Sequence, residues 1–285
     1  MMCSMERVVF RLEGDRFIAT ELAAGPWDPS TQHGGAPSAL LAHAMERCEP
    51  GWSESNGRLM MARITIEILR PVPIASPLDV QVHVVQAGRR THRLEASIEV
   101  DGKQVARASG LRVPLVAVEL PAQLNMSDYE RTPPGPNAPW EPPRWMTEGE
   151  GWAKPSGHGL DAWTNFADAC EHRVVDGTWD DPGECTAWIN VQADMIDGTG
   201  TTPLMRVLTT ADGSAAIGRV LPFEEYTHPN ADLNVHLFRY PVGDWVGIRC
   251  LMWPSDHGVA VGDGELWDER GRIGRTTQAC VVTKR

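Results

Sequence analysis

The sequence predicts an α+β protein built from two tandem units, each an antiparallel sheet wrapped around one helix. Three observations predict this fold. The chain resembles itself at an offset of 169 residues, a proline-dense stretch separates the two similar parts, and each part places a helix-like segment before several strand-like ones. We therefore expect an N-terminal unit over residues 1–120, a linker rich in proline and tryptophan over 121–165, and a C-terminal unit over 166–285.

The first predicted helix spans residues 34–48 and carries alanine, leucine and methionine on nearly every face. A helix enclosed by a sheet must be apolar in this way. The second predicted helix spans residues 204–218, and Asp212 lies on its apolar stripe with Leu204 and Leu208. A buried carboxylate is costly without partners, so Asp212 is either satisfied by hydrogen bonds or kept for chemistry. Alternatively, the Asp-Gly pair ends the helix and the aspartate caps the next segment.

The predicted strands repeat at the same offset. Residues 62–85 align with 231–254, and both segments alternate apolar with polar residues, reach an arginine and a proline together, and continue after a short turn. Residues 101–113 align with 270–282, and each is a glycine-containing turn that leads into another strand. Between the units, residues 130–145 hold too many prolines for a helix or a central strand.

Composition limits the kinds of partner. The net charge of −12 argues against nucleic acid or an anionic membrane surface as a partner. No apolar run approaches the roughly 18–20 residues that span a bilayer, and the first residues do not resemble a signal peptide, so we expect a cytoplasmic protein. The six cysteines have no metal-ligand spacing, which predicts reduced thiols and no metal site. Exposed sheet edges favour a homodimer or a larger homo-oligomer.

Several segments, in their order along the chain, carry a family resemblance. They are "HGGAPSALLAHAMER" (33–47), "ILRPV" (68–72), "TADGS" (210–214), "NADLNVHLFRYPVGDWV" (230–246) and "DERGRIGRTTQACVV" (268–282). Together they resemble the double-hotdog acyl-CoA thioesterases of the thioesterase II group. The resemblance implies a double-hotdog fold and hydrolysis of an acyl-CoA to the free acid and coenzyme A. It implies no cofactor besides the coenzyme A of the substrate.

The resemblance also implies the catalytic residues. In this group an aspartate on the second helix, a threonine or similar polar residue before the next strand, and a glutamine near the C-terminus hold and activate a water. These roles fall on Asp212, Asn230 and Gln278, with asparagine where the best-known members have threonine. At the offset of 169, Asp212 is matched by His43 and Gln278 by Ser109. The polar set is therefore not repeated, and we expect one site, in the second half.

Substrate binding is predicted at the start of the first helix. His33, Gly34 and Gly35 lie at this start, and backbone N–H groups exposed at a helix start can polarise a carbonyl or bind an acyl or phosphate oxygen. The alternative is a plain loop whose glycines permit close backbone approach. Three arginines within residues 89–93 could meet coenzyme A phosphates, but an ordinary solvated hairpin is the preferred interpretation.

Two other functions remain open at this stage. One is a double hotdog that binds acyl groups or a partner without turnover. The other is an enoyl-CoA hydratase, whose Asp-x-Asn-Pro-x-His segment has its residue types, in a different order, in "THPNADLNVH" (227–236). A serine hydrolase is less favoured than either, because no G-x-S-x-G elbow occurs in the sequence.

Overall fold

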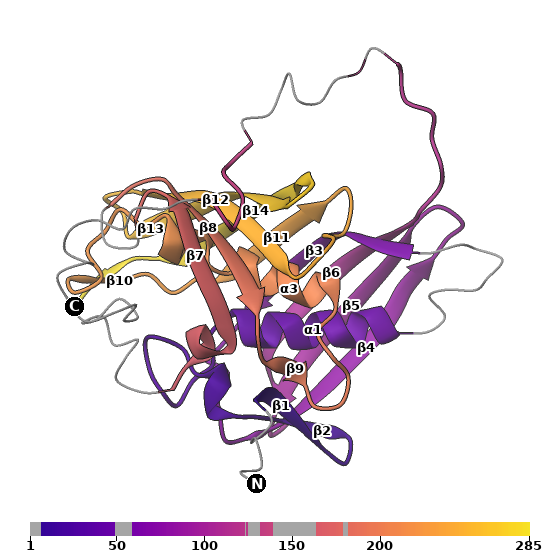
Figure 1. The fold of residues 1–285 in the computed structure, drawn as a ribbon. Coiled ribbons are helices and arrows are strands. Elements are labelled where there is room, and N and C mark those ends of the chain that lie inside the picture. The colour runs from indigo at the N-terminus through magenta and orange to yellow at the C-terminus, as the bar shows by residue number, and fades with distance from the viewer. Residues whose placement is uncertain (1–6, 49–58, 123, 125–131, 139–163, 179–181) are drawn as a thin grey trace, which may run out of the picture.

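In the computed structural model, one large curved sheet encloses two helices that pack against each other, α1 (Gly35–Arg47) and α3 (Pro203–Ala211) (Figure 1). The end of each helix lies beside the start of the other, so the two are antiparallel. The structure describes residues 7–48, 59–122, 124, 132–138, 164–178 and 182–285.

Thirteen strands of the described part form this sheet, in the order β7-β8-β12-β13-β14-β11-β3-β6-β5-β4-β2-β1-β9. The strands of the first half are β1 (Val8–Glu13), β2 (Arg16–Ala19), β3 (Leu59–Ile68), β4 (Pro77–Ala87), β5 (His92–Val100) and β6 (Lys103–Pro114). Those of the second half are β7 (Cys170–Asp176), β8 (Cys185–Val191), β9 (Asp194–Ile196), β11 (Asp232–Leu237), β12 (Trp245–Pro254), β13 (Val259–Asp268) and β14 (Gly271–Val281).

Smaller elements complete the described fold. Two short strands, β10 and β15, form a separate antiparallel pair, and three short helices, η1, η3 and α4, flank the main elements. Their bounds are Tyr226–Thr227, Thr283–Lys284, Glu21–Ala23, Phe166–Ala169 and Ser214–Ile217 respectively.

The two halves are related by a local two-fold axis. Outward from the centre, the first half runs β3-β6-β5-β4-β2-β1 and the second runs β11-β14-β13-β12-β8-β7. The first five strands of each run overlap at the offset of 169, whereas β1 and β7 take the same place in the order without overlapping at that offset. The halves join through antiparallel pairing of β3 with β11, where Thr65 lies opposite Asn234. These two residues differ by 169 positions, so the axis passes through this pair. The predicted α+β fold of two helix-in-sheet units is confirmed.

The core forms around α1 as its composition predicts. All but one of the alanine, leucine and methionine side chains of the helix are fully buried by the sheet and by α3, and Ala44 is partly exposed. Burying one large apolar side chain stabilises a fold by about 1.5–3 kcal/mol, so this helix contributes a substantial part of the core energy. The residues concerned are Ala36, Ala39, Leu40, Leu41, Ala42 and Met45.

The prediction of one continuous helix over residues 204–218 is wrong. Helix α3 ends at Ala211, and the short helix α4 begins at Ser214. Asp212 is the C-cap of α3, and the N–H of Gly213 donates to the carbonyl of Thr210 in a tightened last turn. Glycine is a poor helix former, which favours the break here. The alternative of a helix stop at the Asp-Gly pair is therefore observed, but Asp212 ends α3 and does not cap α4.

Part of the predicted linker lies against the second half of the sheet. Residues 132–138 contain no helix or strand, as their prolines predict, and Trp188 donates its indole N–H to the carbonyl of Pro134 at 2.8 Å. Arg173 donates to the side-chain oxygen of Asn137 at 2.6 Å. Most of the remaining linker lies outside the described residues. The unit boundaries at 120 and 166 therefore remain predictions.

Two expectations from the sequence concern the state of the cysteines and the presence of membrane-spanning helices. The five described cysteines are free thiols, and Cys3 lies outside the described residues. No helix in the described ranges is both long and apolar enough to cross a membrane.

An aromatic cluster holds the segment between α4 and β11 against the loop that leads to α1. Trp27 stacks on Phe223 with ring centroids 4.7 Å apart, and the ring of His228 meets Trp27 edge-on at 5.2 Å. His228 is only 3% exposed. Its burial lowers its pKa from 6.5 to about 4, because the charged imidazolium loses its hydration there.

This cluster predicts a loss of stability in acid. Between pH 6.5 and pH 4 the unfolded chain protonates His228 and the folded chain does not, so the free energy of unfolding falls as the pH falls through this window. One such proton is worth up to about 1.4 kcal/mol per pH unit. We expect His228→Gln to flatten this slope by that amount, measured by urea unfolding at several pH values. The exposed His257→Gln is the control, and equal slopes in the two variants would contradict the prediction.

Candidate active site

The side chain of Gln278 fills the break between α3 and α4. It extends from β14, is 1% exposed, and donates its amide N–H to the backbone carbonyl of Asp212 at 2.8 Å. Its oxygen accepts from the N–H of Ala215 at 3.2 Å and from the hydroxyl of Ser214 at 2.9 Å. Because carbonyls only accept and N–H groups only donate, the amide orientation is fixed. Gln278 thus replaces the helical hydrogen bonds that the break removes.

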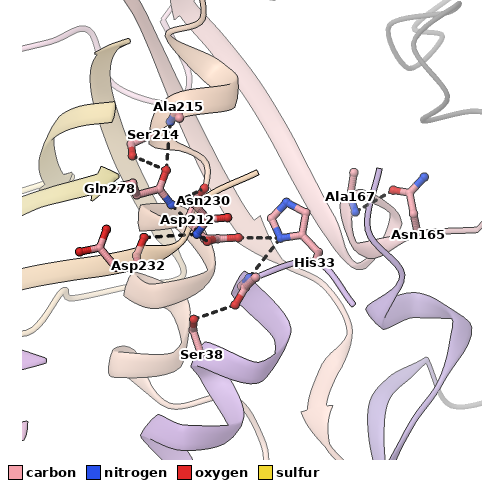
Figure 2. A network of polar contacts seen from close by, with 12 residues as sticks. His33, Ser38, Asn165, Ala167, Asp212, Ser214, Ala215, Asn230, Asp232 and Gln278 are labelled. Atoms are coloured by element: carbon pink, nitrogen blue, oxygen red, sulfur yellow. Dashed lines mark hydrogen bonds and ion pairs between the residues drawn. The ribbon is translucent and has the colours of Figure 1, made fainter. Parts of the chain in front are cut away.

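The Asp212 carboxylate lies at the centre of a polar network (Figure 2). Its Oδ1 accepts from Gln278 at 3.1 Å and from the side-chain amide of Asn230 at 2.8 Å, and its Oδ2 lies 2.8 Å from Nδ1 of His33. A carboxylate offers about four lone-pair positions, so three of them are used. The Asp212 side chain is only 1% exposed. These contacts explain why a carboxylate can lie on the apolar stripe.

Asn230 precedes β11 and lies beside the end of β14 that carries Gln278, and both side chains donate to the same oxygen of Asp212. An isolated bridge to Cys280 fixes its backbone, and its amide nitrogen must face Asp212 because a carboxylate oxygen cannot donate. Among the described residues, nothing hydrogen-bonds to its Oδ1. Asp232 is held elsewhere, accepting from Asn234 at 2.7 Å and from the N–H of Ala279 at 2.6 Å. Asn230 therefore presents one acceptor to a ligand, and Asp232 is structural.

The start of α1 forms the third side of the site. A Cβ atom at Gly34 would lie 2.7 Å from Oδ1 of Asp212, closer than side-chain atoms pack, so only glycine fits there. Within the described part, the N–H of Gly34 donates to no protein group. A free N–H at the start of a 13-residue helix is a favourable place for a developing negative charge.

His33 closes the site with its ring in a fixed position. The imidazole stacks on Phe166 of η3, with centroids 5.0 Å apart and planes inclined by 23°. The N–H of Gly35 points at the same Nδ1 that faces Asp212, at 3.1 Å. A Cβ atom at Gly35 would lie 2.7 Å from the Phe166 ring, so this glycine makes room for the stack. The His33 side chain is 24% exposed.

The structure brings together the residues that sequence analysis selected from both halves. His33 and Gly34 come from the first half, and Asp212, Asn230 and Gln278 come from the second. Gly35 touches the network through the His33 ring. Two residues that hold others in place were not predicted from the sequence. They are Ser214, inside the segment "TADGS", and Phe166, which no motif marks.

The arginine cluster lies away from this site. Two of its members, Arg89 and Arg90, lie in the turn between β4 and β5, and Arg93 lies near the start of β5. His92, the first residue of β5, pairs with Arg112, which donates to the carbonyl of Cys48 at the C-terminal end of α1. The site lies at the N-terminal end of the same 13-residue helix, about 20 Å away. This position agrees with the preferred interpretation of a solvated hairpin.

Family models match both halves of the chain. The acyl-CoA thioesterase N-terminal domain matches residues 23–113, and the acyl-CoA thioesterase C-terminal domain matches residues 121–282. The chain belongs to the acyl-CoA thioesterase family. It is a thioester hydrolase, which confirms the predicted enzyme class and the family resemblance. No protein with a curated description matches the sequence.

Solved structures of low sequence identity share the fold of this thioesterase. A protein described as a putative thioesterase from Novosphingobium aromaticivorans is 19% identical, with a TM-score of 0.64 over 96% of this chain and 98% of its own. A putative thioesterase II from Thermobifida fusca is 14% identical, with a TM-score of 0.61 over 96% and 94%. An acyl-CoA thioesterase II from Mycobacterium marinum is 12% identical, with a TM-score of 0.62 over 96% and 94%.

The symmetry-related location in the thioesterase has a different composition. There the start of α3 meets the end of α1, with Thr202 in the position of His33 and His43 in the position of Asp212. Thr202 caps α3 and donates its hydroxyl to Glu46 at 2.6 Å. Burial raises the pKa of Glu46, and the bond from Thr202 offsets part of that effect. This location links the two helices, and the site residues are not repeated in it, as the offset comparison predicted.

The Glu46 carboxyl predicts a pH-dependent cost to stability. Because its pKa is raised in the folded state, ionising it costs more folded than unfolded, so its contribution to the free energy of unfolding falls as the pH rises above 4.5. Glu46→Gln cannot ionise and can still accept the Thr202 hydroxyl. We expect its stability relative to wild type to increase from pH 4.5 to pH 8, measured by urea unfolding. A difference independent of pH would contradict this prediction, and the exposed Glu13→Gln is the control.

Removing the hydrogen bonds of the Gln278 side chain at the break between α3 and α4 should destabilise the thioesterase. Gln278→Ala leaves the Asp212 carbonyl and the Ala215 N–H buried without partners, which costs about 2–4 kcal/mol of unfolding free energy. Urea unfolding measures this loss. The control is Gln104→Ala on the exposed side of β6, where we expect a change within about 0.5 kcal/mol. Equal losses of unfolding free energy in the two variants would show that Gln278 does not stabilise the break between α3 and α4.

Proposed function

We propose that this thioesterase hydrolyses an acyl-CoA to the free acid and coenzyme A with a water activated by Asp212. The observation that supports the proposal is which hydrogen-bonding positions of the Asp212 carboxylate are occupied. Two amide donors and the His33 ring occupy three of its lone-pair positions. One position is left beside the oxygen of Asn230 and the N–H of Gly34, neither of which bonds to another group among the described residues. A water bound to Asp212 and Asn230 would lie next to a group that can polarise a carbonyl.

In the proposed reaction, Asp212 takes a proton from this water as its oxygen attacks the thioester carbon. General-base assistance of this kind contributes typically 10²–10⁴-fold to a rate. The negative charge that develops on the carbonyl oxygen is stabilised by the N–H of Gly34 and by the positive end of the α1 dipole. The tetrahedral intermediate then collapses, the carbon–sulfur bond breaks, and coenzyme A leaves as its thiolate.

The roles proposed for the two amides differ from each other. The resemblance implies that the glutamine holds the water, but both ends of the Gln278 amide already bond to the protein. We therefore propose that Gln278 positions Asp212, and that Asn230 holds the water through its Oδ1. This division also accounts for asparagine where threonine was expected, since either side chain offers an acceptor oxygen to a water.

Removing the proposed base should nearly abolish turnover. In Asp212→Asn the side chain keeps its shape but loses its capacity to accept a proton from water. We expect thiol release from acyl-CoA to fall at least about a hundredfold, measured with a thiol reagent over substrates from short to long chains. The exposed Asp256→Asn should keep wild-type activity.

Two results would contradict the proposed mechanism or function. Asp212→Asn with activity within about threefold of wild type would remove Asp212 as the base. Wild-type protein that binds acyl-CoA and releases no thiol at any chain length would favour the alternative of an acyl-binding protein without turnover.

The proposal extends to the environment of the enzyme. We propose that it acts in the cytoplasm on an acyl-CoA, uses no cofactor beyond the coenzyme A of its substrate, and assembles as a homodimer or larger homo-oligomer. The described sheet ends at β7 and β9, and edge strands are common surfaces for pairing between copies. Light scattering of the purified protein measures the assembly.

A further inference from the structure

The substrate of the proposed reaction raises a question of charge. Coenzyme A carries a pyrophosphate and a 3′-phosphate, whereas this chain has a net charge of −12. A phosphorylated ligand binds an acidic protein where a cation is exposed and is not already paired with a carboxylate. Such a place must also lie within reach of the thioester site, because the pantetheine arm joins the phosphates to the reacting sulfur.

The aromatic cluster of Trp27, Phe223 and His228 includes an arginine of this kind. Arg285 directly follows β15, is exposed, and donates its backbone N–H to the carbonyl of Glu225 at 2.8 Å. Its guanidinium carbon lies 5.6 Å from the ring centroid of Trp27 and 5.2 Å from that of Phe223. Among the described residues, no carboxylate side chain forms an ion pair with this guanidinium. Arg285 is therefore available to an anionic ligand.

The distances within the cluster show which face of Trp27 is available. Phe223 covers one face in a stacked arrangement, with centroids 4.7 Å apart and planes inclined by 14°. Arg285 is slightly nearer to Phe223 than to Trp27, so its guanidinium lies beside the edge of this stack. His228 meets Trp27 edge-on at 5.2 Å and is 6.3 Å from Phe223, so it also lies beside the stack. Within the described part, no ring or guanidinium covers the second face of Trp27, which is partly exposed.

The cluster lies close to the reacting groups. His228 is two residues before Asn230, and an extended chain advances about 7 Å over two residues. Trp27 belongs to the loop that leads to His33. With the ring contact to His228 and the hydrogen bond from Asn230 added, the Trp27 ring is within roughly 20 Å of the Asp212 carboxylate. The extended pantetheine arm, which contains two amide units, spans a comparable distance.

A second arginine adds positive charge beside the cluster. Burial is the main cause of the lowered pKa of His228, and the charges of Arg219 and Arg285 lower this pKa further. Both guanidinium groups are therefore within electrostatic range of one imidazole. The same segment contains Glu224 and Glu225, and neither side chain pairs with Arg285 in the part of the chain that the structure describes.

We propose that Trp27 and Arg285 form the subsite for the adenosine 3′-phosphate 5′-diphosphate part of coenzyme A, an assignment that rests on the proposed function. The adenine ring stacks on the outer face of Trp27, as bases stack on aromatic side chains elsewhere. Arg285 binds a phosphate at the edge of the stack, where a guanidinium can donate two hydrogen bonds. The nucleotide anchors the substrate outside the reacting site, and the pantetheine arm carries the thioester from there to Asp212.

Binding of adenosine 3′,5′-bisphosphate tests the subsite without any turnover. This compound has the base and phosphates at both positions of the coenzyme A nucleotide but no thioester. By titration calorimetry at low salt, we expect it to bind the wild-type protein, with a Kd that rises at least about tenfold in Arg285→Gln. Trp27→Leu should raise the Kd to a similar extent, because it removes the stacking face. The exposed Arg90→Gln, in the turn between β4 and β5, is the matched control and should bind as wild type.

Kinetics with a truncated substrate separate the subsite from a general defect. An S-acyl-pantetheine has the same thioester and lacks the nucleotide. In Arg285→Gln, we expect KM for acyl-CoA to rise at least about tenfold with kcat within about threefold of wild type, because the nucleotide is bound equally before and during the reaction. The value of kcat/KM for S-acyl-pantetheine should be unchanged, whereas a structural defect would lower it for both substrates.

The results that overturn the subsite are distinct from those that overturn the hydrolysis mechanism. No binding of the bisphosphate at millimolar concentration, or equal Kd values in wild type and Arg285→Gln, would overturn the subsite while thiol release by the wild type stands. Equal losses in Arg90→Gln and Arg285→Gln would show unspecific attraction of phosphate to arginine and would also overturn it. Binding that depends on Arg285, in a protein that releases no thiol, would support the subsite and overturn the hydrolysis mechanism.

Discussion

The side-chain amide of Gln278 is the constraint on which the site depends. It binds the carbonyl of Asp212 and the N–H of Ala215, and so makes a helix break stable inside a packed core. An unbroken helix would keep these backbone groups in its own ladder and would leave no role for the amide. The same amide donates to the carboxylate of Asp212. One buried glutamine therefore both permits the break and holds the proposed base in place.

The two halves use one architecture for different purposes. The strand order is the same, and the halves join where Thr65 pairs with Asn234 on the local two-fold axis. The first helix is continuous because Ala44 stands where the second helix has Gly213, and Ser109 stands where the second half has Gln278. One helix end consequently carries the proposed catalytic network, and the other carries a contact between the two helices. The antiparallel packing of α1 on α3 brings the start of the first helix to the break in the second.

Much of the site was predictable, because its residues occur in short segments that resemble a known family. Gln278 was placed on the terminal strand and Asn230 just before a strand, where they lie, whereas Asp212 lies at the end of α3 and not inside a continuous helix. The glycines at the start of α1 were selected for close backbone approach. The different roles proposed for the Gln278 and Asn230 amides were not predictable. They depend on which lone pairs of one carboxylate are occupied, and residue types do not encode that. The contact of His33 with Asp212 joins residues 179 positions apart and depends on the stack against Phe166.

The sequence by itself determined the duplicated fold, the apolar first helix, the proline-rich separation and the family, since these depend on periodicity, propensity and order along the chain. Only the tertiary structure decided where the second helix ends, because a glutamine 66 residues away supplies the hydrogen bonds that make the break possible. It also decided which neighbour of Asp212 reaches solvent. Burial and lone-pair occupancy are properties of the packed structure, and a local pattern of residues does not fix them.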